Sequence, residues 1–159
     1  MQRREKKTYD NTLKFKDDDI LMVVSIVEKL ETTMEVIYYL MEHENLTPFS
    51  LILLTAEEVE IHKILINEKR DTDIVVQINK EKNIYLLLCQ NTYVDGGYHF
   101  AERIMNHILS NDGKNIYCTE LEVRSTKNAP KAVIFKLVNM FMKAQAENKT
   151  NEIVYRSIN

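Results

Sequence analysis

The sequence has few of the residues that mark several common protein classes. Its 159 residues include two cysteines, three glycines and no tryptophan. Cys89 and Cys118 stand apart within apparent strands, which predicts buried, reduced thiols as in cytosolic proteins. The glycines do not form a Gly-rich phosphate loop, and the four histidines have no metal-ligand spacing with the cysteines. We therefore expect neither a disulfide-rich secreted domain nor a metal or phosphate-loop enzyme, and no cofactor.

Long apolar runs and an excess of positive charge are also missing. The longest apolar stretch, 20–27, is far too short to span a bilayer. The first residues are charged without an apolar core behind them, so a signal peptide is not expected. A net charge of −3 argues against a nucleic-acid polymer as partner. The length and the 45% apolar content predict one cytoplasmic domain with a full core, which could be the cytosolic part of a membrane protein.

The spacing of apolar residues predicts helices and strands in one α+β domain. Apolar residues recur at helical spacing over 20–42, whereas 49–54 is a continuous apolar run typical of a central strand. We expect a charged lead-in at 1–18 and a folded domain at 19–159. This order of elements predicts a central five-stranded, mostly antiparallel sheet flanked by helices. The expected elements are a helix at 20–42, a strand at 49–54, a helix at 56–68, strands at 73–78 and 83–89, a loop at 91–97 broken by Gly96 and Gly97, a helix at 99–109, a strand at 116–123, a helix from residue 130, and an edge strand at 152–156.

A pair of opposite charges precedes the central strand hairpin. Of the six arginines, Arg70 alone has an aspartate three residues on, at Asp73. Asp73 begins the strand at 73–78, which leads into the polar turn at 79–83. Such a pair is either a surface ion pair at a helix-to-strand turn, which contributes about 0–1 kcal/mol, or part of a ligand site.

The position of this pair resembles the centre of GGDEF domains, the bacterial diguanylate cyclases. In that family an Arg-x-x-Asp inhibitory site lies five residues before the Gly-Gly-Asp/Glu-Glu-Phe catalytic turn, and here five residues separate Asp73 from Asn79. The segment Ala101-Glu102-Arg103-Ile104 matches a family segment whose arginine reaches the same ligand. The resemblance covers 19–156 and implies a ferredoxin-like, nucleotide-cyclase-like core. It also implies that Arg70, Asp73 and Arg103 bind cyclic di-GMP, since arginine and aspartate can pair with guanine edges and arginine with phosphate.

The same resemblance implies that the catalytic residues of the family are missing. Thr55 stands where the family has its first metal-binding aspartate, and a hydroxyl cannot replace that charge on a divalent metal. The turn reads Asn79-Lys80-Glu81-Lys82-Asn83, without the two glycines that let a backbone approach the nucleotide. The guanine-binding segment between Thr55 and Arg70 is absent, and Ile26 and Val27 replace a polar Asn-Arg pair. We therefore expect no catalytic or metal-binding residues, with a residual enzyme built on Glu81 as the open alternative.

Two hypotheses on function follow from the resemblance. The first is a catalytically inactive GGDEF domain that acts as a cyclic di-GMP receptor and regulates a partner such as an exopolysaccharide synthesis and secretion system of the Pel type. The second is a ligand-independent structural domain that forms homodimers through the helix at 20–42.

Overall fold

The computed structural model describes residues 15–45 and 47–159, which form four helices and five strands. Each helix presents an apolar stripe to the sheet, and the helices and strands alternate along much of the chain. In chain order the elements are α2 (Asp17–His43), β1 (Phe49–Glu57), α3 (Ile61–Glu68), β2 (Asp73–Asn79), β3 (Ile84–Cys89), α4 (Val94–Ser110), β4 (Lys114–Val123), α5 (Pro130–Ala146) and β5 (Glu152–Ile158).

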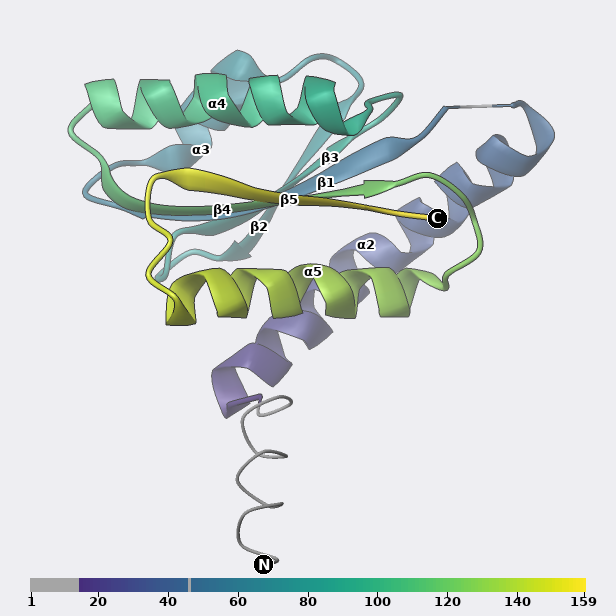
Figure 1. The fold of residues 1–159 in the computed structure, drawn as a ribbon, viewed down its shortest axis with the longest axis horizontal. Helices are drawn as coiled ribbons and strands as arrows, with labels where there is room; N and C mark the ends of the chain where they lie inside the picture. The colour runs from purple at the N-terminus through teal and green to yellow at the C-terminus, as the bar shows by residue number, and fades with distance from the viewer. Residues whose placement is uncertain (1–14, 46) are drawn as a thin grey trace, which may run out of the picture.

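The five strands form one mixed sheet with the order β2-β3-β1-β4-β5. β1 pairs antiparallel with both β3 and β4, and β2 pairs antiparallel with β3. β5 pairs parallel with β4 after the crossover through α5. Figure 1 shows α3 and α4 on one face of the sheet and α2 and α5 on the other. The predicted α+β fold with a mostly antiparallel five-stranded sheet is confirmed.

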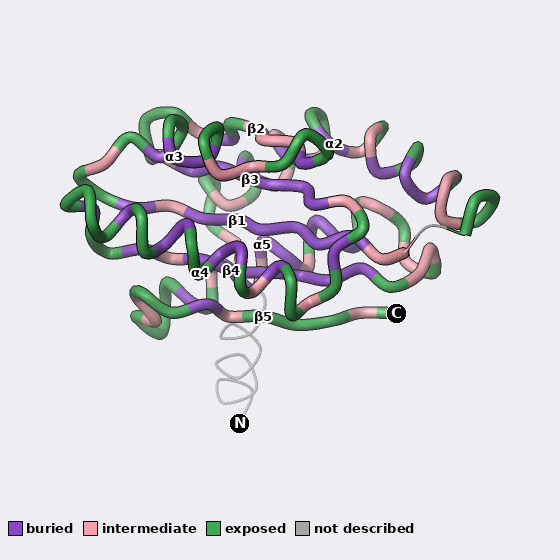
Figure 2. Tube along the Cα trace, turned by 90° about the horizontal axis from the view of Figure 1, so that it is seen from above, coloured by how far each residue is buried: buried purple, intermediate pink, exposed green. Residues whose placement is uncertain are grey.

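Both faces of the sheet are buried, which explains the continuous apolar run at the start of β1. Successive side chains of a strand point to opposite faces. Leu51 and Leu53 therefore pack with α2 and α5, whereas Ile52 and Leu54 pack with α3 and α4. Figure 2 shows β1 and β3 buried along their length, with exposure concentrated on edge strand β5 and the outer sides of the helices.

Three boundaries differ from those predicted. β1 continues to Glu57 and α3 begins only at Ile61. The strand ends there because Glu58 takes a left-handed backbone conformation (φ 66°), which fits neither a strand nor a right-handed helix. α4 begins at Val94, so Gly96 and Gly97 lie inside the helix and the predicted loop at 91–97 is wrong over its second half.

The remaining boundaries agree with the prediction to within a few residues. α2 begins at Asp17, two residues before the expected start of the domain. Residues 1–14 of the predicted lead-in lie outside the described residues. None of the helices in the described parts of the chain is long and apolar enough to cross a membrane.

Candidate functional site

Arg70 and Asp73 lie at the turn that connects α3 to β2. The turn is closed by backbone bonding, because the Asp73 amide donates to the Arg70 carbonyl at 3.0 Å. In return the Arg70 amide donates to Asp73 Oδ2 at 2.8 Å. Asp73 opens β2, whose pairing with Cys89 of β3 fixes its position against the sheet. The three-residue spacing in the sequence is therefore that of a closed turn with its side chains on one side.

Both oxygens of the Asp73 carboxylate accept hydrogen bonds from Arg70. Arg70 Nη2 donates to Asp73 Oδ1 at 2.8 Å, and Arg70 Nε lies 3.2 Å from both carboxylate oxygens. The Asp73 side chain is 0% exposed, whereas that of Arg70 is 53% exposed. This corrects the expectation that Asp73 accepts hydrogen bonds from a ligand: in this arrangement the carboxylate is out of reach and holds Arg70 instead. The hydrogen bond to Asp73 raises the pKa of Arg70 above its ordinary value, so the guanidinium stays charged.

The loop between β3 and α4 fixes the other side of the Arg70 guanidinium. Nη2 also donates to the Gln90 carbonyl at 3.1 Å and to Thr92 Oγ1 at 2.7 Å. The Thr92 hydroxyl in turn donates to the Gln90 carbonyl at 2.8 Å. Gln90 and Thr92 lie 20 and 22 positions after Arg70 in the chain, so no local spacing could have predicted these contacts. Arg70 is thus preorganised, with part of its guanidinium facing solvent.

Arg70 and Arg103 line the same cavity, whose volume is about 280 Å³. Arg103 projects from α4, where its Nε donates to Glu68 Oε1 at 3.2 Å and its guanidinium lies 5.1 Å from the centre of the Phe100 ring. Tyr93, at the start of α4, adds a second aromatic ring that is 52% exposed. The cavity is lined by residues from the turn between α3 and β2, the β3–α4 loop and α4, namely Arg70, Asn91, Thr92, Tyr93, Gly96, Phe100 and Arg103.

The lining of this cavity suits an anion that carries a flat ring. Two arginines supply positive charge and planar donor groups that match phosphate or a guanine edge. Tyr93 supplies an exposed aromatic ring on which a base can stack, whereas Phe100 is buried and supports the Arg103 guanidinium. None of the described residues that line the cavity is acidic. The structure therefore brings Arg70 and Arg103 together, and places Asp73 behind Arg70.

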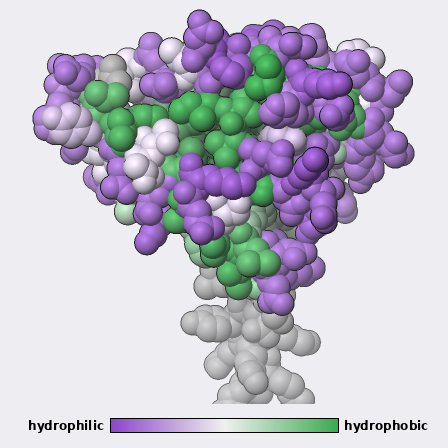
Figure 3. Space-filling view, turned by 180° about the vertical axis from the view of Figure 1, so that it is seen from behind, coloured by the Kyte–Doolittle hydropathy of each residue, from purple (hydrophilic) through white to green (hydrophobic). Residues whose placement is uncertain are grey.

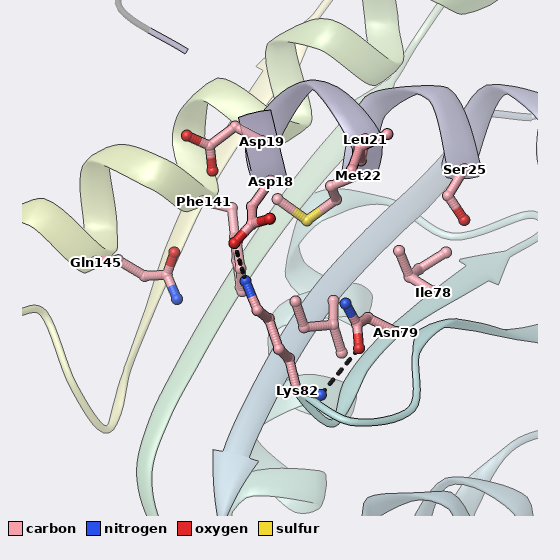
Figure 4. Close-up of a pocket in the computed structure, with 11 residues that line it drawn as sticks. Asp18, Asp19, Leu21, Met22, Ser25, Ile78, Asn79, Lys82, Phe141 and Gln145 are labelled. Atoms are coloured by element: carbon pink, nitrogen blue, oxygen red, sulfur yellow. Dashed lines mark hydrogen bonds and ion pairs between the residues drawn. The ribbon is translucent and has the colours of Figure 1, made fainter. Parts of the chain in front are cut away.

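The turn between β2 and β3 is held by a side chain of its own and by one from β1. Thr55 Oγ1 donates to the Lys82 carbonyl at 2.8 Å, and Asn79 Oδ1 accepts from the Lys82 amide at 2.9 Å. Lys82 Nζ reaches across to Asp18 of α2 at 2.7 Å, an ion pair drawn in Figure 4. This pair lowers the pKa of Asp18, chiefly through the hydrogen bond. Figure 4 shows that Lys82 lies at one side of a cavity of about 300 Å³ between α2 and this turn.

Glu81, the residue on which a residual enzyme would depend, lines a neighbouring cavity with Thr55 and Lys82. Lys82 thus brings a positive charge to the cavity that Glu81 lines, where a divalent metal would need negative ligands. Within residues 15–45 and 47–159, no group of three or more His, Cys, Asp or Glu side chains is placed to hold a metal ion. Three carboxylates line this cavity, those of Glu57, Glu58 and Glu81. Glu57 Oε1 accepts from Asn115 Nδ2 at 2.8 Å, and the Lys82 ammonium group is paired with Asp18.

Two buried glutamates on β4 are functional candidates that the sequence reading missed. Glu120 and Glu122 are 0% exposed and lie on the face of the sheet that α4 covers. Their alternation with Leu121 and Val123 is typical of a strand with one polar, solvated face, so the sequence carries no signal that they are buried.

Comparison with known proteins identifies the fold. No protein-family model matches the sequence, and no curated protein matches it. Among solved structures, the active GGEEF domain of a diguanylate cyclase from Vibrio cholerae is similar, with a TM-score of 0.65 at 13% identity over 83% of this chain and 97% of that one. The GGDEF domain of DgcB from Caulobacter crescentus in complex with c-di-GMP is similar, with a TM-score of 0.67 at 7% identity over 80% of this chain and 86% of that one.

A third similar structure is diguanylate cyclase SiaD from Pseudomonas aeruginosa in complex with its activator SiaC. Its TM-score is 0.63 at 13% identity, over 81% of this chain and 57% of that one. The chain therefore has the fold of GGDEF domains. At such low identity the similarity is one of fold, and function has to be argued from the site.

Proposed function

We propose that this chain is a catalytically inactive receptor for cyclic di-GMP, which binds at the cavity between Arg70 and Arg103. The observation that carries the proposal is that these two arginines line one cavity with exposed aromatic surface, in a domain with the GGDEF fold. Cyclic di-GMP has two anionic phosphates and two flat guanine bases, which are the groups that this lining suits. Solved relatives by fold have been captured with c-di-GMP, which supports the choice of ligand.

The three predicted residues take two different roles in this proposal. Arg70 and Arg103 contact the ligand, through guanine O6 and N7 or through phosphate. Asp73 orients Arg70, since its carboxylate is buried and bonded to that guanidinium. Tyr93 is a further contact, on which one guanine base stacks. A cavity of about 280 Å³ lies at the small end of the roughly 300–1,000 Å³ typical of ligand pockets, so it would take one half of the ligand and leave the other half at the surface.

Three observations support the inactivity. Thr55 uses its hydroxyl to hold the turn at Lys82, where a cyclase of this family needs a metal-binding carboxylate. The Lys82 ammonium group adds positive charge to the same place. Glu57, Glu58 and Glu81 line the cavity, but among the described residues no three acidic, histidine or cysteine side chains are grouped to hold a metal ion, whereas phosphoryl transfer requires carboxylates that fix metal ions.

A ligand-independent dimerisation domain is the alternative. The ion pairs of Arg70 with Asp73 and of Arg103 with Glu68 form without a ligand, and ion pairs that hold the fold together need no further function. The first turns of α2 also expose Ile20, Leu21 and Val24, with Leu21 64% exposed. Figure 3 shows apolar side chains gathering on the rear of the molecule, on which Figures 1 and 2 place α2. This alternative predicts a dimer in light scattering whose population does not change with cyclic di-GMP.

Titration calorimetry with cyclic di-GMP tests the proposal, and the structure decides which variants are useful. Arg70→Ala leaves the buried Asp73 carboxylate without its charged partner, which can destabilise a domain by about 3–5 kcal/mol. Loss of binding in that variant alone would therefore be ambiguous. Arg103→Ala and Gly96→Leu are cleaner changes: the first removes an exposed cation, and the second fills the cavity from a helical glycine whose added Cβ meets only Thr92 Cγ2, at 3.7 Å. Arg156→Ala is the matched control, since it removes an exposed arginine from the opposite edge strand, β5.

The receptor hypothesis predicts binding in the wild type and in Arg156→Ala, with at least about tenfold weaker binding in Arg103→Ala and Gly96→Leu. One arginine that pairs with the ligand is worth about 1–3 kcal/mol, which corresponds to that change. No heat of binding at tens of micromolar protein, or equal affinities in all four proteins, would refute it.

The output of the receptor is proposed from the resemblance alone. A regulated partner in exopolysaccharide synthesis or secretion, met in the cytosol, fits a domain that binds a signalling nucleotide without converting it. Co-purification with such a partner that depends on cyclic di-GMP and is lost in Arg103→Ala would support this assignment, and ligand-independent co-purification would contradict it.

A further inference from the structure

Glu120 and Glu122 form an unusual pair of acids inside the apolar layer between the sheet and α4. On β1 they face Ile52 and Ser50, their register partners. Both glutamates are 0% exposed, although their layer consists mainly of apolar side chains from β1, β3 and α4. Buried carboxylates are costly unless they are paired or protonated, so each of the two needs its own explanation.

Glu122 has a backbone amide beside one carboxylate oxygen and a charged side chain beside the other. Its Oε2 accepts from the backbone amide of Val94, the first residue of α4, at 2.7 Å. Its Oε1 lies 2.8 Å from Arg124 Nε. A carboxylate at a helix N-terminus is favoured by the exposed amides and the helix dipole. Glu122 thus anchors the first turn of α4.

Glu120 has no such partner. Neither of its carboxylate oxygens has a hydrogen-bond partner. The nearest hydroxyl, that of Ser50, donates to the Thr92 carbonyl at 3.0 Å. α4 passes so close that a Cβ added at Gly97 would lie 1.9 Å from Glu120 Oε2. The carboxyl group is therefore enclosed by the helix on one side and the sheet on the other.

Burial outweighs the one neighbouring group that favours a negative charge on Glu120. Burial raises the pKa of Glu120 to about 8, the Ser50 hydroxyl acts in the opposite direction, and the nearby charges of Glu122 and Asp95 raise the pKa further. Arg124 is paired with Glu122. The titratable groups on the elements packed around Glu120 are Glu122 and Cys118 on β4, Asp95 on α4, Cys89 on β3, and Tyr155 of β5, its register partner.

We propose that Glu120 binds and releases a proton in the folded protein, and that its protonation controls how firmly the first turn of α4 packs on β4. The protonated carboxyl is neutral and fits beneath Gly97. The ionised form places an unpaired charge beside Glu122. Water can reach this charge at the lowest cost if the segment at 92–97 lifts away from β4, because Gly96 and Gly97 give this turn low helix propensity. β4 cannot move in the same way, since it is paired on both sides.

The lifted segment carries part of the wall of the ligand cavity. Thr92, Tyr93 and Gly96 line that cavity, and Thr92 Oγ1 holds Arg70 Nη2 at 2.7 Å. Release of this segment would remove one of the hydrogen bonds that hold Arg70 and open the wall against which a ligand packs. The protonated form is therefore the ligand-binding form. This consequence for binding rests on the proposed function, whereas the proton switch itself does not.

Hydrogen exchange of the ligand-free protein tests the switch directly. Amide protection of 92–98 would be measured at pH 7 and pH 9, corrected for the intrinsic pH dependence of exchange, in the wild type and in Glu120→Gln. If the protonated form is the packed form and titrates with a midpoint near pH 8, its population falls about tenfold over this range. Corrected protection should fall by about the same factor in the wild type and stay constant in Glu120→Gln, while amides of α5 show no change in either protein.

Two further measurements keep the proposal falsifiable. Carbon-13 chemical shifts of the glutamate carboxyl groups in the wild type report the titration of Glu120 even if Glu120→Gln does not fold, and a midpoint below about pH 6 would overturn the proposal. Protection that is independent of pH, or that falls equally in Glu120→Gln, would also overturn it.

Calorimetry with cyclic di-GMP at pH 7 and pH 9 separates the two proposals. The switch predicts about tenfold weaker binding at pH 9 in the wild type and no pH effect in Glu120→Gln. A pH-dependent change in protection without binding at either pH would refute the receptor function and support the switch. Equal binding at both pH values with unchanged protection would refute the switch and support the receptor.

Discussion

Gly97→Ala and Glu120→Ala should interact strongly, because one added methyl group and one carboxyl group compete for the same space. A Cβ at position 97 would lie 1.9 Å from Glu120 Oε2 and 2.8 Å from its Cδ, but 3.4 Å from Ser50 Cβ. The last distance is close to ordinary contact, so almost all of the clash is with Glu120. Glu120 is fully buried and cannot move its carboxyl group aside into solvent.

The expected magnitude combines two opposing effects. Overpacking a buried site costs about 1–3 kcal/mol, whereas replacing glycine by alanine inside a helix gains up to about 1 kcal/mol. Gly97→Ala should therefore lower the free energy of unfolding by about 1–2 kcal/mol in the wild type. In the Glu120→Ala background the clash disappears, and the same change should raise it by up to about 1 kcal/mol. The coupling energy between the two changes is then about 2 kcal/mol.

Urea unfolding of the four proteins at pH 6 measures this cycle, at a pH where Glu120 is protonated and the charge of the carboxylate plays no part. Linear extrapolation gives each free energy of unfolding, and the difference of differences gives the coupling. A Gly97→Ala effect of the same sign and size in both backgrounds would show that Gly97 is not required by Glu120, and would refute the packing on which the proton switch depends.

Four further outcomes are expected. The free energy of unfolding should fall as pH rises from about 5 to about 8, by up to about 1.4 kcal/mol per pH unit, because the raised pKa of Glu120 means that the folded state binds the proton more tightly than the unfolded state. Glu120→Gln should flatten this slope, and an unchanged slope would contradict the assignment of the proton to Glu120. Asp73→Ala should destabilise the protein by about 2–3 kcal/mol and weaken cyclic di-GMP binding even when folded protein is titrated, since Arg70 loses the carboxylate that holds it. Unchanged binding would contradict the role of Asp73 in positioning Arg70. Burial raises the pKa of both the Cys89 and the Cys118 thiol, so neither should react with a thiol reagent at pH 8 in the folded protein, and rapid labelling would show that the core opens. Incubation with GTP and Mg²⁺ or Mn²⁺ should give no cyclic di-GMP on chromatography, and product formation would contradict the inactivity.

Most of the fold could be predicted because its helices and strands have clear apolar spacing. The run at 49–54 and the hairpin at 73–89 are confirmed as β1, β2 and β3, since tight turns and continuous apolar runs specify strands locally. The start of α4 was predicted wrongly, because Gly96 and Gly97 read as a break when their local propensity alone is considered. Tertiary packing overrides that propensity here, since the Glu122 carboxylate anchors the first turn and Glu120 leaves no room for a side chain at position 97.

The candidate site could be predicted only in part. The spacing of Arg70 and Asp73 and the helical position of Arg103 placed two arginines correctly on the elements that line one cavity. The hydrogen bonds from Arg70 to Gln90 and Thr92 depend on how β3 and its loop pack beside β2, which no local pattern encodes. The burial of Asp73 likewise follows from the pairing of β2 with β3, and it changes the role of that residue from ligand contact to support.

The most direct test of the receptor hypothesis is a titration of isotope-labelled protein with cyclic di-GMP, followed by amide chemical shifts. If cyclic di-GMP binds at the cavity between Arg70 and Arg103, we expect saturable shifts that cluster at Arg70, at the segment 90–96 and at Arg103. Amides of the turn at 79–83, beside the cavity in Figure 4, should change little. The receptor hypothesis would be contradicted by the absence of shifts at high cyclic di-GMP concentration, or by shifts that cluster at 79–83 while Arg70 and Arg103 stay unchanged.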